Sequence, residues 1–173
     1  EGVPSPSTQE YVEQYLPYLL CGEKAKNEDY TYGESVAKQL DKFIAILKEG
    51  GEGTNQACMN IGPQNAVELT DPPCLRVIDA RIRNNRLCFH VYFRSWDLWG
   101  GFPSNLAAIQ LMKEYVLLHL NEPRYIRAEN ASSDFRVGIK DGPIFAYSKG
   151  LHLYSHHWDL ANIVLGRKHD SSL

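Results

Sequence analysis

The chain has 173 residues, a formal net charge of −3 and a hydrophobic fraction of 43%, which together suit one globular domain with a buried core. It contains no run of Lys and Arg, so the sequence argues against electrostatic docking on nucleic acid or on an anionic membrane surface. No apolar stretch reaches the length that spans a membrane.

The first part of the chain predicts two amphipathic helices. Capping residues at positions 7–10 begin the first helix, which Pro17 is expected to shorten or kink. Apolar residues at helical spacing predict the second helix over 36–47, and Gly50-Gly51 ends it. A polar loop separates the two.

Strands are predicted in the middle of the chain. Apolar or alternating runs over 56–61, 74–83 and 86–93 are bounded by turn residues. Asn84-Asn85 lies between the last two runs and predicts a hairpin turn.

The last third of the chain predicts a long helix, two extended segments and a short helix. Ser104 is expected to cap a helix over 106–120 that is buried on most sides. Short strands are expected over 135–139 and 150–154, and a final helix over 158–165. Helices and hairpin strands in this order predict an α/β or α+β fold.

The spacing of the four cysteines bears on the cellular compartment of the protein. Cys21, Cys58, Cys74 and Cys88 show no paired CxxC spacing, which favours reduced thiols and a cytoplasmic location over a disulfide framework. The first residues include neither an initiator Met nor a signal-peptide pattern, in keeping with a fragment or a processed chain. We expect one domain over 1–173, with or without a further N-terminal segment.

Cys74 follows two prolines in the segment 71–74 and is a candidate nucleophile. The simpler interpretation is an inert, packed thiol, because cysteine is among the most buried residue types. The prolines fix the backbone before the thiol, however, and a nearby arginine would favour the thiolate that attacks electrophilic carbon.

The segment 94–105 places a cation, a hydroxyl, a carboxylate and an amide around a Gly-Gly bend. Arg94 and Ser95 are candidates for a phosphate site, because a guanidinium offers paired donors and the hydroxyl adds another. Asp97 is either a functional carboxylate or an ion-pair partner of Arg94. Asn105 is either a helix-start amide or a reader of uracil, since an amide accepts from N3–H and donates to O4.

Three histidines lie close together at positions 152, 156 and 157. A metal site needs at least three converging ligands, and no Cys or carboxylate partner is nearby, so hydrogen bonding is the simpler role and we predict no metal.

In order along the chain, these motifs resemble the thymidylate synthases, and most of all their short archaeal-type members. The resemblance runs from Tyr30 to Trp158 and rests on Pro73-Cys74, Arg94-Ser95-Trp96-Asp97, Gly101-Phe102-Pro103-Ser104-Asn105 and His152-Leu153-Tyr154. It implies a three-layer α/β (α+β) fold with a mixed twisted sheet, a long buried central helix and sheet-to-sheet homodimer packing.

The resemblance also implies an activity, reductive methylation of dUMP to dTMP with 5,10-methylenetetrahydrofolate as co-substrate. Cys74 would add to C6 of the uracil, Arg94 would lower the pKa of Cys74, and Tyr32 would help remove the C5 proton through water. The implied catalytic residues are Cys74, Tyr32 and Arg94; the nucleotide residues are Arg94, Ser95, Asn105, His152 and Tyr154; the folate residues are Asp97 and Gly101. The implied partners are dUMP, reduced folate and a second copy of the chain, without nucleic acid or membrane.

The chain departs from the family pattern at several positions. Asn55-Gln56 stands where the family has two consecutive arginines, and His156 stands where an asparagine is common. Glu10 and Glu13 are the candidates for the family's N-terminal catalytic glutamate.

Two alternatives stay open at the level of sequence. One is a hydroxymethylase, in which water captures the exocyclic methylene intermediate, and Asn105 favours uracil over cytosine as its base. The other is a non-catalytic homodimeric module that binds a nucleotide.

Overall fold

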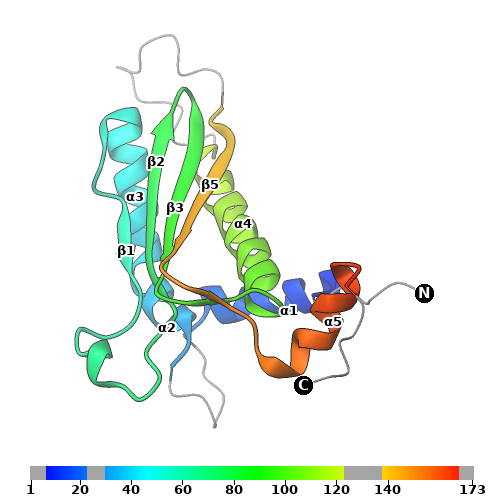
Figure 1. Ribbon diagram of the computed structural model, residues 1–173. Helices are drawn as coiled ribbons and strands as arrows, with labels where there is room; N and C mark the ends of the chain where they lie inside the picture. Colours follow the sequence, from blue (N-terminus) through cyan, green and yellow to red (C-terminus); the bar gives the residue numbers. More distant parts are fainter. Residues whose placement is uncertain (1–6, 23–29, 123–137, 168–173) are drawn as a thin grey trace.

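The computed structural model describes residues 7–22, 30–122 and 138–167, and it combines a mixed sheet with helices (Figure 1). The helices are α1 (Gln9–Leu20), α2 (Tyr32–Ala37), α3 (Leu40–Gly50), α4 (Gly101–Leu120) and α5 (Trp158–Val164), with single 3₁₀ turns at Gly51–Gly53, Ala66–Glu68 and Ser155–His157. The strands are β1 (Cys58–Asn60), β2 (Leu75–Arg83), β3 (Arg86–Phe93), β4 (Trp96–Asp97), β5 (Lys140–Ser148) and β6 (Leu151–His152). Within these described ranges, every helix is too short or too polar to span a membrane.

The main sheet has the strand order β1-β2-β3-β5. β1, β2 and β3 are antiparallel neighbours, whereas β5 runs parallel to β3, so the expected mixed sheet is confirmed. The predicted hairpin is confirmed as well, because Asn84 and Asn85 have φ angles of 49° and 57° and turn the chain directly from β2 into β3.

The hydrophobic core lies between this sheet and the helices α3 and α4, which run side by side along one face of it (Figure 1). Phe43 of α3 meets Phe89 of β3 edge to face, with ring centroids 5.9 Å apart. On α4, the fully buried Lys113 lies 3.1 Å from the carboxylate of Asp141 and also donates to the Gly142 carbonyl, so its charge is paired at the start of β5.

The helix expected over 36–47 is in fact two helices, and this prediction was wrong in its continuity. Thr31 and Glu34 form a capping box that begins the short α2. The side chain of Gln39 then bonds the backbone of Ser35 and both backbone polar groups of Asn60, which ties the break between α2 and α3 to β1. Helix α1 continues past Pro17 as far as Leu20.

The expected role of Ser104 as a helix cap was also wrong. Helix α4 begins three residues earlier, at Gly101, and the Ser104 hydroxyl donates to the Gly100 carbonyl at 2.6 Å from inside the first turn. The carboxylate of Asp97 bonds the amides at the helix start instead, as described below.

Strand β5 was not predicted. The strand expected over 135–139 lies mostly outside the described residues, and 138–139 are not in a strand. Gly142-Pro143 interrupts the β5 sequence like a turn, yet both residues fit here, because proline is tolerated on an edge strand and a Cβ at Gly142 would lie 2.5 Å from the Leu87 carbonyl oxygen. β6 confirms part of the extended segment at 150–154, and α5 confirms the final helix.

Candidate active site

The candidate site residues gather at one end of the sheet, where β2 begins and β3 ends. Cys74 immediately precedes β2, and Arg94 immediately follows β3. The amide of Arg94 donates to the carbonyl of Cys74 at 2.8 Å, which extends the antiparallel pairing by one step. The fold therefore brings the thiol and the guanidinium together across 20 residues of sequence.

The Arg94 side chain reaches back over the residues before Cys74. Its Nη2 lies 3.0 Å from the Asp71 carboxylate, and both Nε and Nη2 donate to the Pro72 carbonyl at 3.1 and 2.6 Å. The ion-pair partner of Arg94 is therefore Asp71 and not Asp97, the partner considered from the sequence. Because Asp71 is largely exposed, this pair is open to competing anions.

The pKa of the Cys74 thiol is raised above its ordinary value. Burial is the largest cause, the Arg94 charge opposes it, and the Asp71 charge adds to it. The expected effect of Arg94 on Cys74 therefore has the right sign, but burial outweighs it.

Two tyrosines flank the thiol. The backbone amide of Leu75 donates to the hydroxyl of Tyr32 at 3.4 Å, and burial strongly raises the pKa of this phenol. Burial, followed by the charges of Cys74 and Asp71, raises the pKa of Tyr30 to about 12. Both side chains are thus neutral hydrogen-bonding groups at physiological pH.

Ser95, His152 and Tyr154 form a second group of contacting side chains. The short strands β4 and β6 pair in parallel, with Asp97 opposite His152. This pairing brings the Ser95 hydroxyl to 2.9 Å from Nδ1 of His152, and the ring of Tyr154 meets the His152 ring edge to face at 5.0 Å.

Asp97 closes the turn that begins α4. Its Oδ1 accepts from the amide of Trp99 at 3.2 Å, and its Oδ2 accepts from the amides of Gly100 and Gly101 at 3.0 and 3.1 Å. Burial is the largest influence on the pKa of Asp97 and raises it, but these three hydrogen bonds and the charge of His152 together lower the pKa below its ordinary value. Asp97 is therefore ionised at neutral pH.

The amide of Asn105 has one partner on each polar atom. Its Oδ1 accepts from the indole of Trp96 at 3.0 Å, and its Nδ2 donates to the hydroxyl of Tyr15 in α1 at 3.0 Å. Since an amide has two acceptor and two donor positions, each atom retains one further hydrogen-bonding position.

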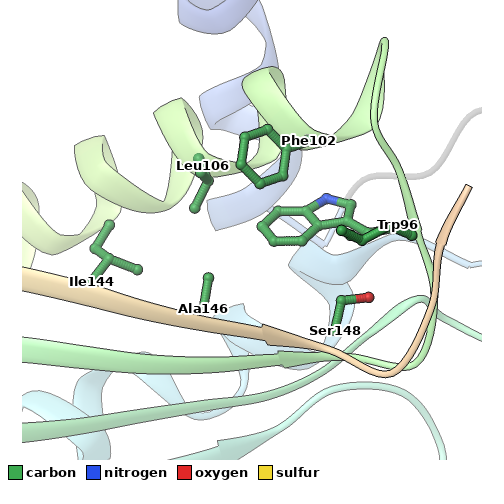
Figure 2. A pocket seen from close by; sticks show the side chains of 7 residues that line it. Trp96, Phe102, Leu106, Ile144, Ala146 and Ser148 are labelled. Carbon is green, nitrogen blue, oxygen red and sulfur yellow. The ribbon is translucent and has the colours of Figure 1, made fainter.

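An apolar pocket of about 480 Å³ lies between the start of α4 and the end of β5 (Figure 2). Figure 2 shows the rings of Trp96 and Phe102 on one side of it and Ile144, Ala146 and Ser148 of β5 on the other. Leu106 and Leu151 complete the lining.

Sequence reasoning missed three partners of the site, namely Tyr15, Tyr30 and Asp71. Tyr15 lies in the first predicted helix, far from the motifs in sequence, and Asp71 belongs to the segment 71–74 that contains Cys74. The candidate glutamates Glu10 and Glu13 are exposed on α1, and each accepts a hydrogen bond from a glutamine of the same helix. Over the residues that the structure covers, no three His, Cys, Asp or Glu side chains are grouped to hold a metal ion.

Comparison with known proteins finds relatives whose names all include thymidylate synthase. A "Putative thymidylate synthase" of Methanosarcina mazei is 29% identical over 165 residues, which are 91% of this chain and 68% of that protein. A protein of the same name from Methanothermobacter thermautotrophicus is 25% identical over 161 residues, covering 90% of this chain and 64% of that protein. The "Thymidylate synthase" of varicella-zoster virus is 24% identical over 146 residues, which are 84% of this chain and 43% of the viral protein.

The fold comparison agrees. The crystal structure of thymidylate synthase from T4 phage superposes with a TM-score of 0.60 at 20% identity, over 79% of this chain and 44% of the phage chain. The chain is therefore similar, in sequence and in fold, to proteins named thymidylate synthase. No family model matches it. The chain spans about two thirds of the length of the archaeal relatives and less than half of the phage enzyme.

Proposed function

We propose that the protein is a thymidylate synthase, which converts dUMP to dTMP by reductive methylation with 5,10-methylenetetrahydrofolate. The observation that carries this proposal is the backbone hydrogen bond between Arg94 and Cys74. It brings a residue with a partly buried thiol next to a residue with a positive charge at the end of one sheet. The archaeal relatives that bear the same name support it.

In the proposed reaction, the Cys74 thiolate adds to C6 of the uracil ring and makes C5 nucleophilic. C5 forms a bond to the one-carbon unit and loses its proton. The nucleotide is released from Cys74 when the sulfur–C6 bond breaks and the C5–C6 double bond forms again. The folate supplies the one-carbon unit and the hydride that reduces it to a methyl group, and it leaves as dihydrofolate. Tyr32, as a neutral phenol, orients the water that takes the C5 proton.

The remaining roles are those that the resemblance implies, and the hydrogen-bonding groups at the site support them. Arg94 and Ser95 bind the nucleotide phosphate, with the phosphate replacing Asp71 on the guanidinium. Asn105 reads uracil through its second donor and acceptor positions, and His152 with Tyr154 binds the ribose 3′-hydroxyl.

Asp97 and Gly101 are proposed to bind the folate. Asp97 is ionised and accepts three hydrogen bonds, which leaves about one of the four acceptor positions of a carboxylate for an N–H of the pterin ring. Gly101 has no side chain beside that carboxylate, so its backbone allows close approach. These residues fit a reduced folate.

We also propose that two copies of the chain pair through the outer face of the main sheet, in the cytoplasm. Tyr92, Phe145 and Tyr147 point away from α3 and α4, and 39%, 43% and 55% of their surfaces are exposed. A group of exposed aromatic side chains on neighbouring strands is typical of an interaction surface. The four cysteines form no disulfide, which suits a reducing compartment.

The test is mass spectrometry of the protein after incubation with 5-fluoro-dUMP and methylenetetrahydrofolate. Fluorine at C5 does not leave as a proton does, so a covalent adduct of protein, nucleotide and folate is expected to accumulate. Cys74→Ala should abolish the adduct. Cys58→Ala removes an exposed thiol elsewhere on the sheet and should retain it.

A folded native chain that forms no adduct would contradict the proposal. With dUMP itself, the product mass separates methylation from hydroxymethylation. Nucleotide binding without any adduct or product would favour the non-catalytic module.

A further inference from the structure

Five aromatic and imidazole rings form a continuous series beside the proposed ribose site. We call this series the ring column, and it consists of Trp99, His157, His156, Tyr154 and His152. It begins at the turn that starts α4 and ends at the His152 side chain that is bonded to Ser95.

The contacts along the ring column are close at every step. Trp99 stacks on His157 with centroids 5.5 Å apart, and His157 lies 4.1 Å from His156. His156 stacks nearly parallel on Tyr154 at 5.6 Å and 14°. The amide of His157 also donates to the Tyr154 carbonyl at 2.9 Å, so a 3₁₀ turn places both imidazoles next to the tyrosine.

Ring packing is what holds His157 in this series. Its Nδ1 is buried and has no hydrogen-bond partner within the described part of the chain. A ring without such a hydrogen bond is oriented by its neighbours, here Trp99 on one side and His156 on the other. The backbone of Trp99 is held in turn by the hydrogen bond from its amide to Asp97.

Tyr154 depends on the same packing. More than half of its surface is exposed, at 53%, so the protein core does not fix its rotamer. His156 stacks on the phenol ring, and the planes of the His152 and Tyr154 rings meet at 88°. Without His156, the phenol would be free to turn about its side-chain bonds.

We propose that His156 and His157 are positioning residues for Tyr154, and that they set the preference of the site for a nucleotide with a 3′-hydroxyl. This inference rests on the proposed function, in which Tyr154 binds that hydroxyl. Neither imidazole touches the nucleotide; both act by holding the phenol in the orientation in which its O–H meets the ribose.

The test compares the affinities of dUMP and 2′,3′-dideoxyuridine monophosphate by calorimetry. The native chain is expected to bind dUMP more tightly. In His156→Ala this preference should fall roughly threefold to tenfold, which corresponds to the loss of one hydrogen bond. His156→Phe retains a planar ring and should keep the preference within about twofold.

His119→Ala is the matched control, because His119 also packs against a tyrosine, Tyr115, but near the far end of α4. It should leave the preference unchanged. His156 is exposed, so its variants are expected to fold, and thermal unfolding checks this; His156→Leu, which fills the space without a planar ring, should lose the preference as the alanine variant does.

The outcomes separate the two proposals. An unchanged preference in folded His156→Ala, or an equal loss in His156→Phe, would overturn the positioning role and leave the proposed function standing. A native chain that binds dUMP without any preference would also overturn it. A native chain that binds neither nucleotide would overturn both proposals.

Discussion

The reactivity of Cys74 depends on two charges that act in opposite directions. Arg94 lowers the pKa of the thiol and Asp71 raises it, while burial has the largest effect. Because Asp71 is exposed and bonds Arg94 through one nitrogen, its carboxylate can be removed without touching the contacts of Arg94 with Pro72.

We predict that Asp71→Asn lowers the pKa of Cys74, because it removes a negative charge that disfavours the thiolate. The pH profile of iodoacetamide alkylation at Cys74 should shift to lower pH, since the rate follows the thiolate fraction. Arg94→Met should shift the profile to higher pH. Peptide mass spectrometry reads Cys74 separately from the other thiols.

Cys58 provides an internal control in the same samples. Burial and the charge of Asp79 raise its pKa, and neither Asp71 nor Arg94 contributes. Its profile should stay constant in both variants. Profiles of Cys74 that move in the same direction in Asp71→Asn and Arg94→Met would contradict the opposed charges.

At this scale, the sequence predicts the residues that lie within short motifs and misses those that tertiary packing brings in. Arg94 and Ser95 are adjacent, so one strand end carries both. Tyr15 bonds Asn105 from 90 residues away, and no local pattern contains that contact. The partner of Arg94 was missed because only Asp97, three residues away in sequence, was considered, whereas Asp71 is brought to Arg94 by the pairing of β2 with β3.

Among the elements, α4 shows how a short segment prepares the site. The helix starts at Gly101 because the Asp97 carboxylate accepts three backbone amides, two of which belong to residues 100 and 101. The same carboxylate is proposed to meet the folate, so the helix start and the ligand site share one side chain.

We predict that Asp97→Ala destabilises the protein by about 1 kcal/mol at neutral pH, the usual effect of losing a helix cap. The pKa of Asp97 is lower in the folded chain than its ordinary 3.8. Its charge therefore contributes stability that is present above that value and is lost as the pH falls through the lower, folded value. Urea unfolding of native and variant chains at several pH values measures the difference.

Asp97→Asn is the control for charge. Asparagine keeps one acceptor oxygen but no charge, so its destabilisation should be smaller, and the difference in stability between Asp97→Asn and Asp97→Ala should stay constant as the pH falls through the titration of Asp97. A difference between the native chain and Asp97→Ala that stays constant down to the most acidic point would show that the charge makes no contribution.

Helix α2 carries Tyr32 to the site and depends on one glycine. A Cβ on the buried Gly33 would collide with the backbone carbonyls of Tyr18 in α1 and of Cys21, which follows α1. Backbone cannot move as a flexible side chain can, so the two helices would have to separate.

We predict that Gly33→Ala destabilises the protein by about 1–3 kcal/mol and displaces Tyr32 from the amide of Leu75, which lowers the rate of adduct formation with 5-fluoro-dUMP. Gly53→Ala is the matched control, because a Cβ there meets no atom within 4 Å. Chemical unfolding and adduct mass spectra measure both effects. Equal stability of the two variants would contradict the close packing of α1 on α2.

The elements themselves were predictable where the local signals agree. Asn84-Asn85 between two apolar runs specified the β2–β3 hairpin correctly. Apolar spacing alone did not reveal the break at Gln39, because a long-range contact with Asn60 makes it. Strand β5 was not predicted because Gly142-Pro143 is typical of a turn. These residues would interrupt a central strand, but they are accepted at the edge of a sheet.

For the whole molecule, the two faces of the sheet differ. The inner face packs on α3 and α4, whereas the outer face exposes Tyr92 and Tyr147, which are opposite one another on β3 and β5, and stacks His90 on Phe145 at 4.7 Å. An aromatic surface of this kind is costly to leave in water, and pairing with a second copy covers both surfaces at once by twofold symmetry.

We predict that the native chain sediments as a dimer and that Tyr147→Asp raises the dimer dissociation constant at least about tenfold, because it places a charge inside the apolar contact. Leu118→Asp is the matched control: Leu118 is 66% exposed on α4, away from the outer sheet face, and its variant should remain dimeric. Sedimentation equilibrium measures both constants. A native chain that is monomeric at all concentrations would contradict the proposed pairing, and equal weakening by both variants would place the contact on another face.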